Sequence, residues 1–485
     1  MITSTRKKIN IPSTEAIIKG ISDEGGLFLF ETLKKSFFKK LDSTLTYSEV
    51  AFFVMKELLL DFNDLQIKEA IGNSYNESNF IPEPVSLIDQ GSFSYLNLYN
   101  GPTFAFKDMA LSILPYLLKT SKSIQNNTST SLILTATSGD TGSAALNGFQ
   151  SLDNTKVVVL YPEGGVSQIQ EKQMLSYKND NTFIISVKGN FDDCQNLVKK
   201  AFKEIPLAKI TYTSANSINI GRLVPQIVYY FYSYLQLVKN GTIQENSKIN
   251  YSVPTGNFGN IFAAYLAKEM GLPINKLICA SNSNNVLTDF FNTGTYTIDR
   301  EFYKTYSPSM DIIISSNLER FLYLASDNNV SYVKTLMSQL KASSTFNVNN
   351  IIKSKFTNFY ANYITDEATT DLIKSTFENT NILIDPHTAV ALGVYNKYLK
   401  ETNDDTHTII VSTANPYKFP SALASAFDLN RSLDDFEILE EVAKITNKKV
   451  DQRLLRIKDV DSSHPIWEKE NSFNLLRKLI GTLDV

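Results

Sequence analysis

The sequence predicts an α/β protein whose parallel strands alternate with helices, because three stretches of the chain share one plan. Each has an apolar run rich in strand-forming residues, then a short polar loop, then a helix of small residues. These stretches cover residues 132–146, 249–266 and 408–424. In open parallel sheets such loops gather at the carboxyl ends of the strands, where ligands bind. We therefore expect the three loops to surround one site.

The length and composition are typical of a globular protein with several domains. A chain of 485 residues exceeds one hydrophobic core, so roughly two or three domains are expected. The formal net charge is −3 and no basic stripe is visible, which argues against a nucleic-acid partner. There is no run of about 18 apolar residues and no apolar amino-terminal leader, so we expect neither a membrane partner nor secretion.

The positions of the cysteines and histidines argue against a disulfide framework and against a metal site. Cys194 and Cys279 lie far apart in the sequence, which suits a reducing cytoplasm better than a disulfide framework. The histidines are His387, His407 and His464, and none has a cysteine or another histidine close by. We therefore expect a cytoplasmic protein without a metal site, with each histidine on the surface or at a helix end.

One lysine is distinguished by its neighbours. Lys107 follows Phe104 and Phe106 and precedes an apolar helical pattern that begins at Met109. Burial and the positive end of a helix dipole both disfavour an ammonium group at such a position. A neutral amine attacks aldehydes, so Lys107 is a candidate Schiff-base lysine. The alternative is a lysine that merely extends its ammonium group into solvent.

The loop of the second stretch has the character of a phosphate cradle. Its residues are Gly256, Asn257, Phe258, Gly259 and Asn260. The glycines let the backbone approach an anion, and the helix that follows offers unpaired N–H groups and a positive dipole end. The loop lacks the Gly-Lys-Ser/Thr ending of a nucleotide P-loop and the G-x-G-x-x-G of a dinucleotide site. The alternative is an ordinary strand-to-helix turn.

Four segments together carry a family resemblance. They are GPTFAFKD (residues 101–108), TATSGDTGSAA (135–145), PTGNFGN (254–260) and STANPYKFP (412–420). They resemble the threonine synthases, which are fold-type-II pyridoxal-phosphate enzymes. The likeness extends to residues 4–6, 23–27 and 216–222 and thins after about residue 427. It implies a fold like that of tryptophan synthase β, with parallel or mixed sheets flanked by helices.

The resemblance and the helical patterns together give a domain plan. Residues 1–95 form a mainly helical amino-terminal domain, with one helix expected over 47–60. Residues 116–210 form a small α/β domain inserted into a large cofactor-binding domain made of 96–115 and 211–485. We assign no function to the charged tail after Leu429.

The resemblance also implies how the cofactor is held. Lys107 would carry pyridoxal 5'-phosphate as a Schiff base and then move protons, and residues 256–260 would bind the cofactor phosphate. Thr413 would face the pyridine nitrogen, where a hydroxyl can donate or accept a hydrogen bond. The alternative for Thr413 is a strand-terminal threonine present for its β propensity.

A second group of residues is expected to meet the substrate. Ser138, Asp140 and Thr141 would contact the amino-acid head or the cofactor hydroxyl, although these residue types are also common helix N-caps. Asn219 and Arg222 are candidates for a substrate phosphate, since arginine binds phosphate through two hydrogen bonds. The alternative is an arginine paired with a nearby acid. Lys418 is a weaker candidate of the same kind.

The reaction implied is conversion of O-phospho-L-homoserine and water to L-threonine and phosphate, the last step of threonine biosynthesis, by a monomer or homodimer. Three alternatives remain open: a threonine-synthase-like phospho-lyase that releases a 2-oxo acid, a threonine or serine dehydratase, and a non-enzymatic paralogue. The intact Lys107 argues against the last. Asn100 and Asn415 stand where the family usually has histidine, which leaves the phospho-lyase open because asparagine does not titrate.

Overall fold

The computed structural model describes residues 1–150, 152–430 and 432–484. Its larger sheet is built from β3 (Ser86–Asp89), β4 (Phe93–Asn97), β9 (Ile249–Pro254), β10 (Ile274–Ser281), β13 (Phe359–Tyr363) and β14 (Thr408–Ser412). The strand order is β13-β10-β9-β14-β4-β3. Neighbouring strands are parallel except for the antiparallel pair β3 and β4. The mixed sheet that the resemblance implied is therefore confirmed.

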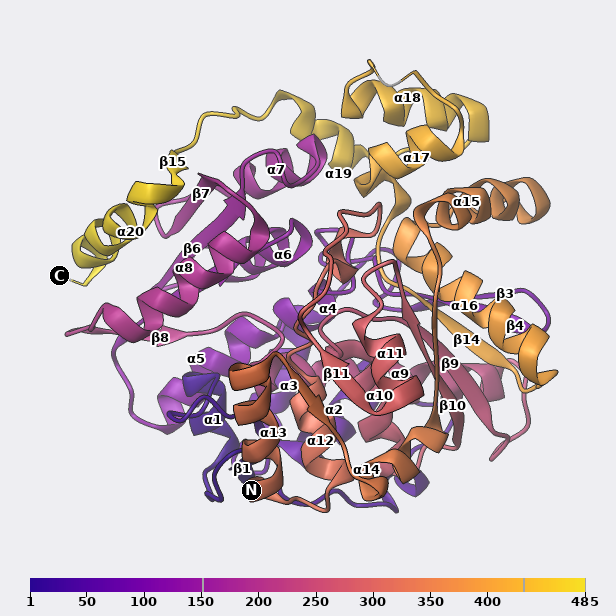
Figure 1. The fold of residues 1–485 in the computed structure, drawn as a ribbon, viewed down its shortest axis with the longest axis horizontal. Helices are drawn as coiled ribbons and strands as arrows, with labels where there is room; N and C mark the ends of the chain where they lie inside the picture. Colours follow the sequence, from indigo (N-terminus) through magenta and orange to yellow (C-terminus); the bar gives the residue numbers. More distant parts are fainter. Residues whose placement is uncertain (151, 431, 485) are drawn as a thin grey trace.

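A second, smaller sheet is wholly parallel. Its strands are β5 (Thr130–Ala136), β6 (Thr155–Pro162), β7 (Thr182–Lys188), β8 (Ile210–Thr213) and β15 (Ile466–Glu468), in the order β15-β7-β6-β5-β8. Its helices are α6 (Asp140–Phe149), α7 (Gln168–Leu175), α8 (Phe191–Glu204) and α20 (Lys469–Leu483). This unit occupies the upper left of Figure 1. Parallel strands need crossover connections, and helices supply the internal ones here.

The amino-terminal region is mainly helical, as predicted. It contains α1 (Ser13–Lys19), η1 (Phe37–Lys40), α2 (Tyr47–Leu58) and α3 (Asp64–Ser74), and an antiparallel pair formed by β1 (Ile2–Ser4) and β2 (Phe28–Phe30). The helix expected over 47–60 is α2, which begins with a capping box between Thr46 and Glu49. Its Val50 and Val54 are fully buried, so the apolar stripe seen in the sequence is the face that packs inward.

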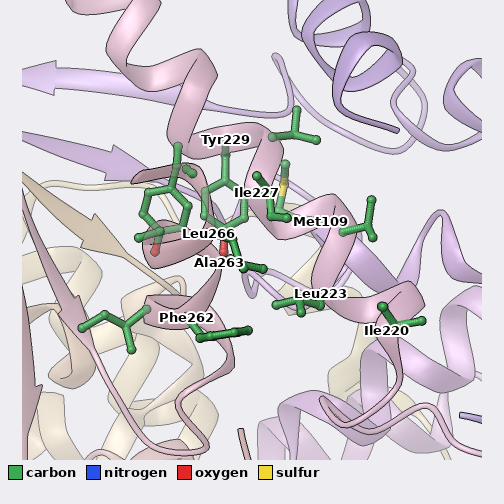
Figure 2. Packing of buried hydrophobic residues seen from close by; sticks show 14 of the residues in the cluster. Met109, Ile220, Leu223, Ile227, Tyr229, Phe262, Ala263 and Leu266 are labelled. Carbon is green, nitrogen blue, oxygen red and sulfur yellow. The ribbon is translucent and has the colours of Figure 1, made fainter. Parts of the chain in front are cut away.

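A buried core at the centre of the molecule fixes the two helices that follow the predicted cofactor segments. These are α4 (Asp108–Leu111), directly after Lys107, and α10 (Gly259–Glu269). Both pack against the long helix α9 (Ile220–Lys239), and α5 (Leu114–Ile124) lies beside them. Figure 2 shows the side chains of Leu223, Met109 and Phe262 in this core. A fully buried side chain of this kind contributes about 1.5–3 kcal/mol, so both loops are anchored on rigid supports.

The carboxyl-terminal segment differs from the predicted domain plan, which placed residues 211–485 in the large unit. After η4 (Pro416–Lys418), α17 (Pro420–Ala426), α18 (Asp435–Thr446), α19 (Gln452–Leu455) and η5 (Arg456–Asp459), the chain crosses to the small sheet, where β15 pairs with β7. Leu476 and Ile480 of α20 are buried in one cluster with Leu197 of α8. The Asp484 carboxylate accepts hydrogen bonds of 2.6, 2.7 and 2.9 Å from the N–H groups of residues 208–210.

The rest of the large unit carries helices and short strands around the larger sheet. They are α11 (Val286–Thr293), β11 (Thr295–Thr297), η2 (Pro308–Met310), α12 (Leu318–Ala325), α13 (Val330–Ser343), β12 (Thr345–Asn347), α14 (Asn350–Lys355), η3 (Phe356–Asn358), α15 (Asp366–Thr380) and α16 (Pro386–Thr402). Among the described residues, no helix has the length and apolar character needed to cross a bilayer.

Candidate active site

A cavity of about 770 Å³ opens where the carboxyl ends of β5, β9 and β14 meet. Its volume is in the range of small-molecule sites, about 300–1,000 Å³. Residues of all three predicted strand–loop–helix units line it. The predicted site residues on its wall are Lys107, Ser138, Thr141, Arg222, Gly256, Asn257, Phe258, Gly259, Asn260 and Thr413.

Lys107 stands at the amino end of α4 with its amine facing the cavity. The Nζ atom lies 3.4 Å from Asp140 Oδ2, donates to Ser309 Oγ at 3.2 Å, and lies 5.0 Å from the Phe106 ring centroid. Burial lowers the pKa of this amine, and the cation of Lys418 lowers it further, whereas Asp140 acts in the opposite direction. The pKa ends below its ordinary value, so more of the amine is neutral and nucleophilic than in an exposed lysine.

Asp140 lies behind Lys107 instead of on the cavity wall. Its Oδ1 atom lies 2.7 Å from the Nζ of the fully buried Lys418 and accepts a hydrogen bond from Gln170 at 3.0 Å. Burial would raise the pKa of Asp140, but the two ammonium groups outweigh it and hold the pKa below its usual range. The Lys418 amine also donates to the carbonyl of Thr103 at 2.7 Å. Lys418 is therefore committed to internal partners and does not face the cavity as a phosphate ligand.

The N–H groups of residues 256–260 have no hydrogen-bond acceptor within the described part of the chain, whereas the Thr255 N–H donates to the carbonyl of Ala280 at 2.9 Å. Two carbonyls of this loop are occupied: Ser315 Oγ donates to the carbonyl of Gly256 at 2.7 Å, and Asn317 donates to that of Asn257 through its backbone and side-chain nitrogens, both at 3.0 Å. Phe258 adopts a left-handed conformation with φ of 62° and leads into α10. The first N–H groups of a helix have no intrahelical partner and suit an anion.

Two buried side-chain donors on the cavity wall also lack partners. Asn260 Nδ2 and Arg222 Nε make no hydrogen bond within the described part of the chain. Arg222 Nη1 donates to the carbonyl of Ala215 at 2.6 Å, and burial lowers the pKa of its guanidinium to about 10. Because unpaired buried donors are costly, both atoms fit an anionic ligand.

Thr413 is joined to the lysine segment by the backbone. Its carbonyl accepts a hydrogen bond of 2.7 Å from the N–H of Phe106, and Ala105 and Ala414 form an antiparallel bridge. Thr413 follows directly after β14, and its side chain lines the cavity. The segment before Lys107 and the end of β14 are therefore held side by side by backbone hydrogen bonds.

Asn219 and the two asparagines that depart from the family pattern do not line the cavity. Asn219 caps α9: Nδ2 donates to the carbonyls of Ile17 and Ser214 at 3.1 and 2.9 Å, and Oδ1 accepts from Gly221 N–H. This corrects the expected phosphate contact. Asn100 donates to the carbonyl of Glu83, and Asn415 caps η4. The departures therefore lie outside the cavity wall.

The sequence interpretation missed His387 and Ser309, which also line the cavity. His387 does stand near a helix start, in the first turn of α16, but it is buried and not on the surface. A signal for it was present, because Asp385-Pro386 after an apolar run is typical of a helix N-cap and first turn. Ser309 lies in an irregular loop, where local pattern carries no such signal.

Comparison with known proteins gives a consistent family assignment. A family model described as pyridoxal-phosphate dependent enzyme matches residues 95–414, and models for the threonine synthase N terminus and C-terminal region match residues 2–75 and 388–464. Threonine synthase of Saccharomyces cerevisiae is 34% identical, over 94% of this chain and 95% of that protein. The chain belongs to the threonine synthase family.

Two further relatives refine this assignment. A crystal structure of threonine synthase from Brucella melitensis with bound pyridoxal phosphate superposes with a TM-score of 0.83 at 32% identity, covering 99% of this chain and 98% of the other. Threonine synthase-like 1 of Macaca fascicularis is 38% identical over 86% of this chain, which spans only 58% of that longer relative.

The cofactor of this family member is pyridoxal phosphate, and the site fits it. The donors suit the group: an amine with a lowered pKa, the first N–H groups of α10, and the Asn260 amide nitrogen, which has no partner among the described residues. A Cβ atom on Gly256 would lie 2.6 Å from the carbonyl oxygen of Ser309. Only glycine, which has no Cβ atom, lets the backbone at position 256 lie this close to Ser309.

Proposed function

We propose that the protein converts O-phospho-L-homoserine and water to L-threonine and phosphate. The observation that carries this proposal is one cavity that joins a lysine of lowered pKa to two separate sets of free anion donors. One set is at the start of α10 and the other includes Arg222. A cofactor phosphate and a substrate phosphate require two such sets. Membership in the threonine synthase family supports the same assignment.

The geometry and the family resemblance support three cofactor-binding roles. Residues 256–260 would bind the cofactor phosphate, Lys107 would form the covalent link, and the Thr413 hydroxyl would meet the ring nitrogen. When bound, pyridoxal phosphate withdraws electrons from the substrate Cα and so makes its proton acidic. The released Lys107 amine would then move protons at Cα and Cβ. Asp140 would orient that amine from behind without touching the substrate.

Other residues on the cavity wall would bind the substrate while it reacts. Arg222 would bind the substrate phosphate, and Ser138 and Thr141 would bind the amino-acid end. The bond from Cγ to the phosphate oxygen breaks and phosphate leaves with the bonding electrons. The hydroxyl of water then adds at Cβ, and protons return to Cγ and Cα. We propose that the enzyme acts as a cytoplasmic monomer or homodimer.

One assay tests the proposal against its alternatives. The purified protein is incubated with O-phosphohomoserine, and threonine, 2-oxobutanoate and phosphate are all quantified. We expect threonine and phosphate in equal amounts, because Asn100 and Asn415 lie away from the cavity. Phosphate with 2-oxobutanoate would identify a phospho-lyase, and turnover of threonine or serine alone would identify a dehydratase. No turnover of any of them would indicate a binding protein.

A further inference from the structure

The fully buried Asp385 carboxylate organises two walls of the cavity. Asp385 caps α16, and its Oδ1 accepts hydrogen bonds from the backbone N–H and the Nδ1–H of His387, at 2.9 and 2.8 Å. Its Oδ2 accepts from the Thr388 hydroxyl, whose oxygen lies 2.9 Å from that of Ser412. Ser412 is the last residue of β14, directly before Thr413.

The contact with Asp385 decides which ring nitrogen of His387 carries the proton and which one accepts a hydrogen bond. Since Nδ1 donates to the carboxylate, Nε2 is the acceptor. Nε2 accepts the backbone N–H of Ser309 at 3.2 Å. His387 is only 2% exposed, and its ring packs edge-on against Phe419, with 4.8 Å between ring centroids. The imidazole is therefore held in one orientation and holds Ser309 in turn.

Ser309 lies between the two cofactor-binding segments. Its Oγ atom accepts from Lys107 Nζ at 3.2 Å and lies 3.5 Å from Asp140 Oδ2. Its carbonyl is the atom that a Cβ on Gly256 would meet at 2.6 Å. A shift of Ser309 would therefore disturb both the amine of Lys107 and the phosphate loop.

We propose that Asp385 and His387 are positioning residues for the reaction, which hold Ser309 in place and through it orient the Lys107 amine. This inference rests on the proposed role of Lys107 in the reaction. His387 acts through its unprotonated Nε2 as a hydrogen-bond acceptor and exchanges no proton with the substrate. Displacing a reacting group by about 1 Å can cost on the order of a hundredfold in rate, so a residue in this position affects turnover strongly.

Two substitutions separate the contacts of His387. The amide of His387→Gln reaches the position of Nε2 and keeps an acceptor for Ser309, whereas the shorter His387→Asn keeps a donor for Asp385 and loses Ser309. In the purified holoenzyme we expect His387→Asn to lower kcat by about tenfold to a hundredfold with KM within about twofold. We expect His387→Gln to recover most of that loss. His407→Gln, a histidine outside the cavity that contacts Ser94, is the matched control.

A second readout does not depend on turnover. The rate at which borohydride reduces the C=N bond that would link Lys107 to the cofactor, with the product mapped by mass spectrometry, reports the access to that bond and its activation, and both change when the Lys107 nitrogen is displaced. His387→Asn and Ser309→Ala should both change this rate by at least about threefold, and His387→Gln should change it less. Equal effects of the two His387 substitutions, or an unchanged rate in Ser309→Ala, would overturn the inference. If the wild-type protein forms no threonine, the proposed function fails, but the borohydride rates still decide the positioning role.

Discussion

The loops at residues 255–260 and 137–142 begin alike and differ in what they can bind. Each follows a buried parallel strand, contains two glycines, and leads into a helix that borders the cavity. In the first loop, neighbouring side chains and backbone occupy the carbonyls of Gly256 and Asn257, and among the described residues the N–H groups of 256–260 have no acceptor. In the second, Thr137 Oγ1 accepts from the N–H groups of Gly139 and Gly142 at 3.0 and 2.8 Å.

This difference shows that glycine content alone does not make an anion site. The loop of residues 256–260 offers backbone donors to a phosphate. In the 137–142 loop two backbone donors, those of Gly139 and Gly142, are taken by Thr137, and the side chains of Ser138 and Thr141 line the cavity. By occupying two backbone donors, the Thr137 hydroxyl therefore distinguishes the proposed substrate loop from the proposed cofactor loop. The predictions below test this separation, from the largest expected effect to the smallest.

Lys107 is the group that both loops face, and its loss should have the largest effect. We expect Lys107→Ala to fold normally but to lose turnover by at least about a thousandfold, because the residue supplies both the covalent link and the proton transfers. Steady-state kinetics and circular dichroism would measure this. Lys122→Ala is the control, since Lys122 is also a buried lysine with a pKa lowered by burial but lies outside the cavity. Turnover of Lys107→Ala within tenfold of wild type would contradict the assigned role.

Gly256→Val should weaken cofactor binding by about a hundredfold. The new Cβ would approach the Ser309 carbonyl to 2.6 Å, so the loop would have to move away from the bound phosphate. Titration of the cofactor-free protein with pyridoxal phosphate measures the dissociation constant. Gly259→Ala is a milder change in the same loop, because its Cβ would come no closer than 3.3 Å to Asn317 Nδ2. An unchanged dissociation constant for Gly256→Val would move the phosphate site elsewhere.

Thr137→Val should lower the stability of the fold without weakening cofactor binding, in contrast to Gly256→Val. It keeps the shape of the side chain but leaves the N–H groups of Gly139 and Gly142 without an acceptor, so the free energy of unfolding should fall by about 2 kcal/mol. The affinity for pyridoxal phosphate should stay within about threefold, since this loop is not proposed to bind the phosphate. Urea denaturation and cofactor titration measure the two quantities. A loss of cofactor affinity as large as that of Gly256→Val would remove the distinction between the loops.

Asn219→Ala should have the smallest effect on stability and none on substrate binding. It tests whether Asn219 or Arg222 binds the substrate phosphate. Loss of the α9 cap should lower the free energy of unfolding by about 1 kcal/mol and leave KM for O-phosphohomoserine unchanged. Arg222→Gln, three residues later, should instead raise KM by about tenfold, because it removes a charged donor from the cavity wall. A raised KM in the Asn219 variant would return that residue to the substrate site.

The sequence by itself determined the strand–loop–helix units, because their signals are local. Apolar periodicity identified β5, β9 and β14 and the helices after them, and glycine spacing marked the 255–260 loop. The aromatic neighbours of Lys107 predicted an amine in an apolar setting, and the structure shows a pKa lowered mainly by burial. The periodicity and the glycine spacing depend on residues within one or two turns of the chain, whereas the lowered pKa also depends on burial in the fold and on Lys418.

The tertiary structure decided how those units are completed, because the partners come from distant parts of the chain. Lys418 reaches Asp140, His387 reaches Ser309, and β15 joins the small sheet beside β7. Asn219 turned inward as a helix cap because two backbone carbonyls and one N–H were within its reach. No periodicity encodes such contacts, since hydrogen-bonding side chains of the same type serve caps, ion pairs and ligand sites equally well. Which donors remain free to bind a ligand was fixed only when the chain had folded.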